Sequence, residues 1–236
     1  RTYQDLLQSK TDEDNFDVLA TSELYRVGFE GEVVMWQGKG IYTRIEFSPD
    51  GSYLLVTSLH QPYSYIVPSN RFPATPAVHD KDGRLVKTVY ESPLVEAMPQ
   101  GFMATTEGRR NIGWRADLPA TLYWVEALDG GDPAREVEFR DEVSTWSAPF
   151  SGEPAGLIKP IDRYVGIIWG NEHTAVLYDQ LWNTRNMRTY LFDPSDGSST
   201  VLFDRNYQDI YTDPGDFDTN RNAFGRYTLN LDGNTA

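Results

Sequence analysis

Three histidines, His60, His79 and His173, are the side chains of this sequence best suited to act as a general base near neutral pH. A serine that such a base activates typically sits in a Gly-x-Ser-x-Gly pentad between a strand and a helix. The pentad does not occur in this sequence, and each histidine falls at the end of an expected strand or in a turn. We therefore interpret the three histidines as structural or solvated, and we expect no catalytic residue in this chain.

Two groups of acidic residues could offer oxygen ligands to calcium. The first begins with Asp80-Lys81-Asp82-Gly83, but Leu85 stands where a calcium loop requires glycine, so a hairpin turn explains it better. The second group consists of Asp213, Asp216, Asp218 and Asn220. It lacks a downstream acidic residue, and calcium at this place is the weaker interpretation. We expect neither a metal ion nor a cofactor.

The element that organises the chain is a hairpin between Ile45 and Ser58. Two apolar runs flank a Ser-Pro-Asp-Gly turn, in which Pro49 presets φ, Asp50 is a turn former and Gly51 supplies the conformation that a Cβ would hinder. In the second run three apolar residues, Leu54–Val56, are consecutive, which predicts a strand buried on both faces. Antiparallel strands covered on both faces are typical of stacked small sheets, such as the blades of a propeller.

The hairpin recurs along the chain. Trp114 and Trp169 each stand just before a turn, as Phe47 does. Between these hairpins lie hairpins of a second kind, with turns at Phe29–Glu32, Asp80–Gly83 and Asp193–Gly197. Two hairpins per unit make a four-stranded blade. We interpret the recurring aromatic position as structural, and we expect Trp114 and Trp169 to be buried between blades.

The sequence therefore predicts an all-β fold, an incomplete β-propeller of about four blades with four antiparallel strands each, after a helical segment at 1–22. The expected blades cover approximately 23–37, 42–90, 110–161, 164–203 and 214–236. In the helical segment Tyr3, Leu6 and Leu7 share one helical face, and Asp12–Asp14 could open a second short turn.

Composition excludes several classes of protein. The chain has 236 residues, no cysteine and a formal net charge of −14. The charge opposes binding to nucleic acid or to anionic membrane surfaces, and no apolar run is long enough for a membrane-spanning helix. Without cysteine there are no disulfides, thiolate zinc sites or cysteine nucleophiles.

Several phrases of the sequence read as those of a known family. They are Arg1–Leu7, Asp12–Asp14, Ser58–Pro68, Arg71–Pro73, the run WRADLPATLYWVE at 114–126, Asp129–Asp132, Leu202–Arg205 and Asp213–Gly215. The chain resembles the glutamyl endopeptidases of the prolyl oligopeptidase clan, serine peptidases found in plastids and in bacteria. The resemblance implies a propeller, with WD40-like or TolB-like repeats, followed by an α/β-hydrolase domain that cleaves after glutamate with a Ser-Asp-His triad.

That resemblance sets the expected function. This chain would be part of the N-terminal propeller, without the catalytic domain, and would pack against that domain and gate the access of peptide substrates to it. Partner chains or self-association through open blade edges are further expectations. The compartment stays open between a bacterial periplasmic or secreted location and a plastid.

A substrate carboxylate would need cationic donors, and four arginines are the candidates. They are Arg109, Arg110, Arg185 and Arg188. A guanidinium fork suits a carboxylate. The alternative is that these arginines form ion pairs with acids such as Glu107 and Asp179, or belong to a solvated face.

Two other classes of function stay open on the sequence alone. A free-standing propeller scaffold for protein–protein interaction would need a closed ring of blades. A propeller glycosidase or lyase would need paired carboxylates facing a central funnel, and no pair is marked by its context. The coding sequence downstream of Ala236 would distinguish these classes from a peptidase.

Overall fold

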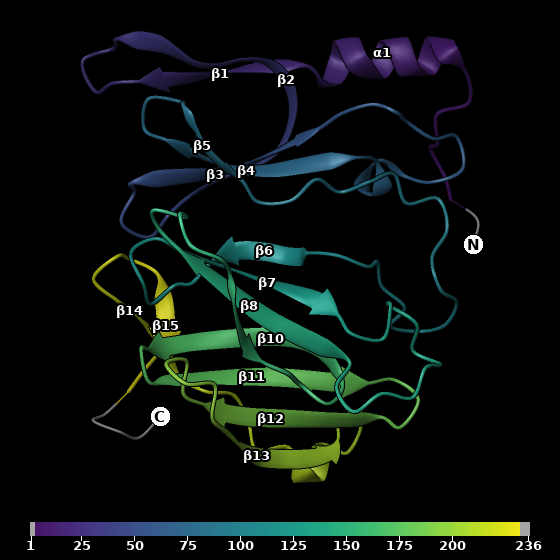
Figure 1. The fold of residues 1–236 in the computed structure, drawn as a ribbon, viewed down its shortest axis with the longest axis vertical. Coiled ribbons are helices and arrows are strands. Elements are labelled where there is room, and N and C mark those ends of the chain that lie inside the picture. Colours follow the sequence, from purple (N-terminus) through teal and green to yellow (C-terminus); the bar gives the residue numbers. More distant parts are fainter. Residues whose placement is uncertain (1–2, 232–236) are drawn as a thin grey trace. The chain divides into compact units, whose positions relative to one another are not determined.

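The computed structural model describes residues 3–231 of the chain, which form two compact units with the boundary between Ala97 and Met98. The first unit contains one α-helix and a set of antiparallel strands (Figure 1). Its elements are α1 (Lys10–Ala20), β1 (Ser22–Val27), β2 (Val33–Phe47), β3 (Tyr53–Leu59), the 3-10 turn η1 (Ser69–Arg71), β4 (Ala74–Asp80) and β5 (Leu85–Thr88).

The helix α1 begins at a cap that the sequence provides. The Ser9 side chain accepts a hydrogen bond from the backbone N–H of Asp12 at 3.3 Å, and Asp12 and Glu13 complement the helix dipole in the first turn. The expected helical face of Tyr3, Leu6 and Leu7 is wrong, since these residues precede the helix in irregular structure. A segment of that length is too short to hold a helix alone, and Leu7 instead packs on the cluster of Leu59, Val67 and Phe72.

The long strand β2 takes part in two pairings. Its first half pairs with β1, from Val27 opposite Val33 to Ser22 opposite Gly40. Its second half pairs with β3, from Ile41 opposite Leu59 to Phe47 opposite Leu54. The second half of β2, β3, β4 and β5 thus form one four-stranded antiparallel meander, and β1 with the first half of β2 forms a hairpin that precedes it.

The turn between β2 and β3 follows the local chemistry of its residues. Gly51 has φ +69°, and its N–H donates to the carbonyl of Ser48 at 2.8 Å. The Ser48 hydroxyl donates to Asp50 at 2.6 Å and accepts from the N–H of Tyr53 at 3.0 Å. The consecutive residues Leu54–Val56 that follow are buried, which confirms the prediction of a strand covered on both faces.

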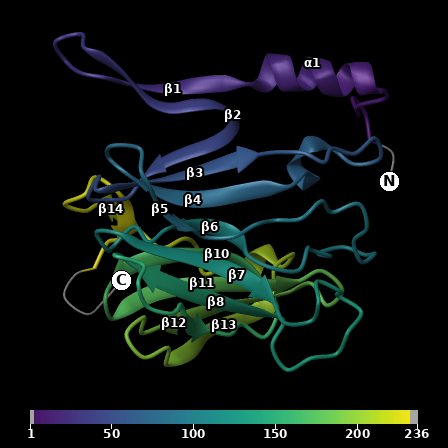
Figure 2. The ribbon, with the colours of Figure 1, turned by 45° about the horizontal axis from the view of Figure 1, so that its top comes forward.

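The second unit contains two further four-stranded meanders and a two-stranded sheet (Figures 1 and 2). The first meander is β6 (Arg110–Trp114), β7 (Thr121–Ala127), β8 (Asp141–Ser147) and β9 (Ala155–Ile158). The second is β10 (Arg163–Asn171), β11 (Thr174–Leu181), β12 (Asn186–Phe192) and β13 (Ser199–Asn206). The 3-10 turn η2 (Ile210–Thr212) follows, and then β14 (Thr219–Arg221) pairs with β15 (Tyr227–Leu229).

The two meanders of the second unit pack face to face. Their shared core joins side chains of the first, such as Val125 and Val143, to side chains of the second, such as Trp169, Leu177 and Phe192. Antiparallel meanders of four strands that stack in this way have the form of propeller blades. The predicted fold class is confirmed, because the described residues are mostly β, form four-stranded antiparallel sheets and include one short N-terminal helix.

Within residues 3–231 no helix has the length and apolar character needed to span a lipid bilayer.

Candidate functional site

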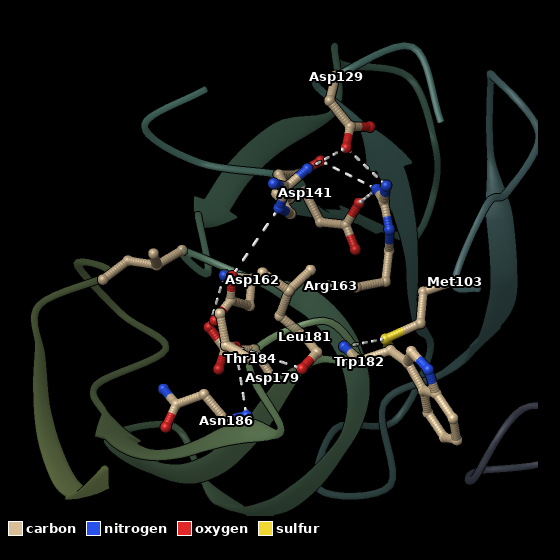
Figure 3. A network of polar contacts seen from close by, with 12 residues as sticks. Met103, Asp129, Asp141, Asp162, Arg163, Asp179, Leu181, Trp182, Thr184 and Asn186 are labelled. Atoms are coloured by element: carbon tan, nitrogen blue, oxygen red, sulfur yellow. Dashed lines mark hydrogen bonds and ion pairs between the residues drawn. The ribbon is translucent and has the colours of Figure 1, made fainter. Parts of the chain in front are cut away.

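A buried network of arginines and aspartates lies at one end of the strands of the second unit (Figure 3). Arg110, Asp141 and Arg163 are the first residues of β6, β8 and β10. Because strands alternate in direction along a meander, the starts of its first and third strands and the end of its second strand meet at one edge. Arg110 and Asp141 therefore meet at one edge of their meander. Arg163, at the start of the first strand of the next meander, reaches the same edge.

Asp141 is the centre of the first half of the network. Its buried carboxylate accepts hydrogen bonds from Arg110, from Arg163 Nη1 at 2.6 Å and from the N–H of Tyr164 at 2.7 Å. Asp129, in the connection between β7 and β8, accepts from Arg163 Nη2 at 2.6 Å and from Arg140 Nη1 at 3.0 Å. Arg163 of one meander is thus held by two carboxylates of the preceding one.

Asp179 and Asp162 form the second half. The buried Asp179 carboxylate accepts from the N–H of Asp162 at 2.8 Å and from the Tyr190 hydroxyl at 2.7 Å. Asp162 accepts from Arg188 Nη1 at 2.5 Å, and it lies 3.8 Å from Arg140 Nε. Arg140 therefore connects the two halves.

The electrostatics of this network indicate a structural role. Burial raises the pKa of Asp179, against hydrogen bonds from Asp162 and Tyr190 that lower it. Burial also lowers the pKa of Arg110, and the nearby charge of Asp141 opposes that effect. Four arginines balance four aspartates in the network, so each buried charge has an opposite charge beside it. Such pairs are costly to break and hold their elements in one geometry.

The structure separates the four arginines that the sequence singled out. Arg110 and Arg188 belong to the network. The Arg109 guanidinium lies over the Trp124 ring at 4.2 Å, with Glu126 at 4.0 Å. The hypothesis that these arginines bind a substrate carboxylate stays a prediction, and three of the four have a carboxylate of this chain within 4.0 Å.

Arg185 differs from the other three. Its guanidinium stacks on the Trp182 ring at 3.8 Å, and its Nη1 donates to the Tyr207 hydroxyl at 3.3 Å. Among the residues that the structure describes, no carboxylate lies within ion-pair distance of it. The backbone N–H of Trp182 donates to Met103 Sδ (Figure 3). Phe102 stacks on the Trp182 ring, so the segment before β6 holds the indole on which Arg185 stacks.

The six residues that the sequence marks as structural lie in three meanders. Trp114 and Trp169 are buried, with exposed fractions of 6% and 4%. Phe47 is 56% exposed, although it occupies the same position before a turn. Pro49, Asp50 and Gly51 form the turn that follows it.

The three histidines do not meet. His60 is exposed and lies 3.1 Å from Thr75 Oγ1, and His173 is exposed and lies 3.3 Å from Asp193 Oδ2. His79 is half-buried against Trp36, and burial lowers its pKa. In the part of the chain that the structure describes, no cluster of three or more histidines and acidic residues could hold a metal ion.

Sequence reasoning missed most of the network, namely Asp129, Arg140, Asp141, Asp162 and Arg163. A signal was present, since the dipeptides Arg140-Asp141 and Asp162-Arg163 lie at the starts of two successive strands, β8 and β10. Opposite charges at the entry to buried strands indicate buried ion pairs, because an isolated charge would be expelled from that position.

No protein-family model matches the chain. Two curated proteins do, both named "Probable glutamyl endopeptidase, chloroplastic": one from Oryza sativa subsp. japonica and one from Arabidopsis thaliana, each 42% identical over 233 residues. The chain is a homologue of one region of the glutamyl endopeptidases. The alignment covers 97% of this chain but 25% and 24% of these relatives, so the chain spans about a quarter of their length. The resemblance found in the sequence is confirmed.

Solved structures with partial likeness include an uncharacterized protein of Listeria monocytogenes, with 11% identity and a TM-score of 0.47 over 78% of this chain and 47% of that chain. Another is a putative 6-phosphogluconolactonase of Bacteroides fragilis, with 13% identity and a TM-score of 0.35 over 79% of this chain and 65% of that chain. These likenesses are too weak to carry an argument.

Proposed function

We propose that this glutamyl endopeptidase homologue supplies non-catalytic propeller blades of a serine peptidase, which pack against an α/β-hydrolase domain and limit the access of substrates to it. The observation that carries the proposal is the 42% identity over nearly the whole chain to one region of the glutamyl endopeptidases. Two features support it: the sequence has no Gly-x-Ser-x-Gly pentad, and the described residues form stacked four-stranded meanders. The division into blades at 23–37, 42–90, 110–161, 164–203 and 214–236 belongs to the same proposal.

The non-catalytic part of this proposal is tested with an active-serine probe. The purified 236-residue chain should not react with a fluorophosphonate and should not cleave glutamyl peptides, because no serine lies in a nucleophile elbow. The full gene product, treated in parallel, should be labelled at one serine outside these residues. Stoichiometric labelling of a serine in the 236-residue chain would contradict the proposal.

The gating part is tested in the full gene product by weakening the ion pairs of Asp162 in the buried network. Asp162→Asn keeps the shape of the side chain but removes the charge that holds Arg188 and Arg140. We expect cleavage of a folded protein substrate to rise relative to cleavage of a short glutamyl peptide. The matched control is Asp204→Asn, which alters a 53% exposed partner of Arg188. An unchanged ratio of the two rates in a folded Asp162→Asn protein would contradict gating.

Recognition of the substrate's glutamate by an arginine of this region is the remaining proposal, and its best candidate is Arg185. A guanidinium that already stacks on an indole is oriented for a planar carboxylate. Arg185→Gln in the full gene product should then raise KM for glutamyl peptides, with KM for alanyl peptides unchanged. If KM for both peptides stays the same, Arg185 does not recognise the substrate carboxylate, and the alternative that the sequence offers holds for it.

A further inference from the structure

The hairpin of β1 and the first half of β2 is apolar on both faces and largely uncovered. Its exposed apolar side chains are Tyr25, Val27, Val33, Val34 and Met35. Three of them are consecutive in β2, so they point to opposite faces of the ribbon. Strands that carry apolar residues on both faces are typical of sheets covered from both sides.

The outer edge of β1 is open. β1 ends the order of its sheet, and β2 is its only strand neighbour among the described residues (Figures 1 and 2). Each of the three meanders has four strands, and the chain runs from the fourth strand of one meander to the first strand of the following one. The first half of β2 leads directly into the first strand of a meander, so by its connection it corresponds to the fourth strand of a preceding meander. Its neighbour β1 then corresponds to the third strand of that meander.

An apolar groove of about 430 Å³ lies beside the hairpin. Leu24, Trp36, Ile45, Phe47 and Leu54 line it. Ile45 and Phe47 lie two residues apart on the first strand of the following meander, so they share one face of it, and they are 46% and 56% exposed. Phe47 makes contacts within the chain, but more than half of its surface stays accessible to solvent.

The second unit shows what covers this position in a complete pair of meanders. Trp169 stands on β10, the first strand of its meander, at the position that Phe47 has on β2. Its ring contacts that of Tyr123 with centroids 5.4 Å apart, and Tyr123 lies on β7, the second strand of the preceding meander. The side chain that would cover Phe47 therefore belongs on a second strand, which the hairpin lacks.

We propose that the β1 edge and the groove of Ile45 and Phe47 form a docking surface for two antiparallel strands, supplied by the same polypeptide from outside residues 1–236. These strands would pair with β1 to complete a four-stranded blade, and the second of them would place a large apolar side chain against Phe47. Main-chain hydrogen bonds along β1 give such an addition its affinity, and the groove gives it its register. This inference does not depend on the gating function.

The occupant follows from the length of the relatives. The aligned region is about a quarter of each relative, so most of each relative's polypeptide lies outside it. Strands from that polypeptide would be present at a high effective concentration, which a second copy of the chain would not match. A strand pair from the same polypeptide therefore outcompetes a second copy at the β1 edge.

Hydrogen exchange measured by mass spectrometry tests the pairing. Peptides that cover residues 22–27 should exchange fast in the dilute 236-residue chain and much more slowly in the full gene product. Peptides that cover β5 (Leu85–Thr88) serve as the control and should exchange alike in both. Fast exchange of 22–27 in the full gene product would overturn the proposal, and so would protection that disappears on dilution, because that would assign the edge to a second copy.

A photoreactive phenylalanine at position 47 identifies the occupant. In the full gene product, irradiation should cross-link it within one polypeptide to a residue outside 1–236. A cross-linked dimer would overturn the proposal.

Two variants test the groove without a cross-linker. In the full gene product Phe47→Asp should lower the melting temperature by several degrees, whereas Leu85→Asp should leave it nearly unchanged. Leu85 is 60% exposed on β5 and lies outside the groove, so it is the matched control for an added charge. Equal melting temperatures for both variants would overturn the proposal.

Discussion

Trp114 is the residue at which the repeated aromatic position can be tested most directly. Trp114 lies on β6 and is 6% exposed, and its ring centroid lies 6.2 Å from that of Phe150. Trp114→Ala should lower the free energy of unfolding by about 3–5 kcal/mol, through lost burial and a residual cavity. Urea unfolding followed by far-UV circular dichroism measures this change. Tyr211→Ala, at a 93% exposed ring, is the control and should change it by less than about 0.5 kcal/mol. A loss below about 1 kcal/mol for Trp114→Ala would mean that the site is not a packing position.

The half-buried His79 side chain should make the stability of the first unit depend on pH. Burial lowers its pKa in the folded chain, and the Ala77 backbone and the nearby charge of Asp80 oppose this effect. The His79 side chain of the unfolded chain therefore binds a proton more readily than that of the folded chain. The contribution of neutral His79 to the free energy of unfolding is complete above pH of about 6.5, and it is lost as pH falls through the folded pKa. The urea midpoint should fall between pH 7 and pH 5, and it should fall less in His79→Gln.

The exposed His60 provides the control for this pH dependence. His60→Gln should retain the full decrease of the midpoint on acidification, because it changes an exposed position and leaves His79 in place. An identical pH dependence in His79→Gln and the unmodified chain would show that His79 does not contribute.

At the scale of elements, Asp141 connects three strands, because it binds Arg110 of β6 and Arg163 of β10 from its place in β8. Asp141→Ala should cost about 3–5 kcal/mol, since it leaves two buried guanidinium groups without this carboxylate. Asp204→Ala, at a 53% exposed carboxylate, should cost less than about 1 kcal/mol. Denaturant unfolding of both variants tests the difference, and comparable losses would mean that burial does not set the strength of these ion pairs.

The elements also show how far the sequence alone could lead. The hairpin at Ile45–Ser58 was predictable, because a Pro-Asp-Gly turn and consecutive apolar residues are local signals. The charged dipeptides at strand starts indicate buried ion pairs, but their partners could not be predicted, because Arg110 binds a carboxylate 31 residues away and Arg163 binds one 34 residues away. No periodic pattern marks a charged residue whose partner is that distant.

The exposure of Phe47 was equally beyond local reasoning. Its position before a turn is that of Trp114 and Trp169, yet Phe47 is exposed and the two tryptophans are buried. The helix start was misplaced for a related reason, since Leu7 packs on residues of the β3–β4 connection rather than on its own turn. Tertiary contacts decided both cases.

At the scale of the whole molecule, the isolated chain should not behave as a monomer. Exposed apolar side chains on the β1–β2 hairpin and an open strand edge favour pairing with another copy when no other strands are available. Light scattering at micromolar concentration should detect species larger than 26.8 kDa. A monodisperse monomer that unfolds cooperatively would contradict this prediction and the incomplete-propeller architecture with it.

The balanced network of arginines and aspartates also determines where the charge of the molecule resides. Because it removes equal numbers of both signs from contact with water, the formal net charge of −14 remains on the solvated surface. That surface repels anions over about one Debye length, which is about 8 Å at physiological ionic strength. A polyanionic molecule would therefore approach this surface slowly in dilute buffer and faster as salt is added, so that rising ionic strength would accelerate such encounters.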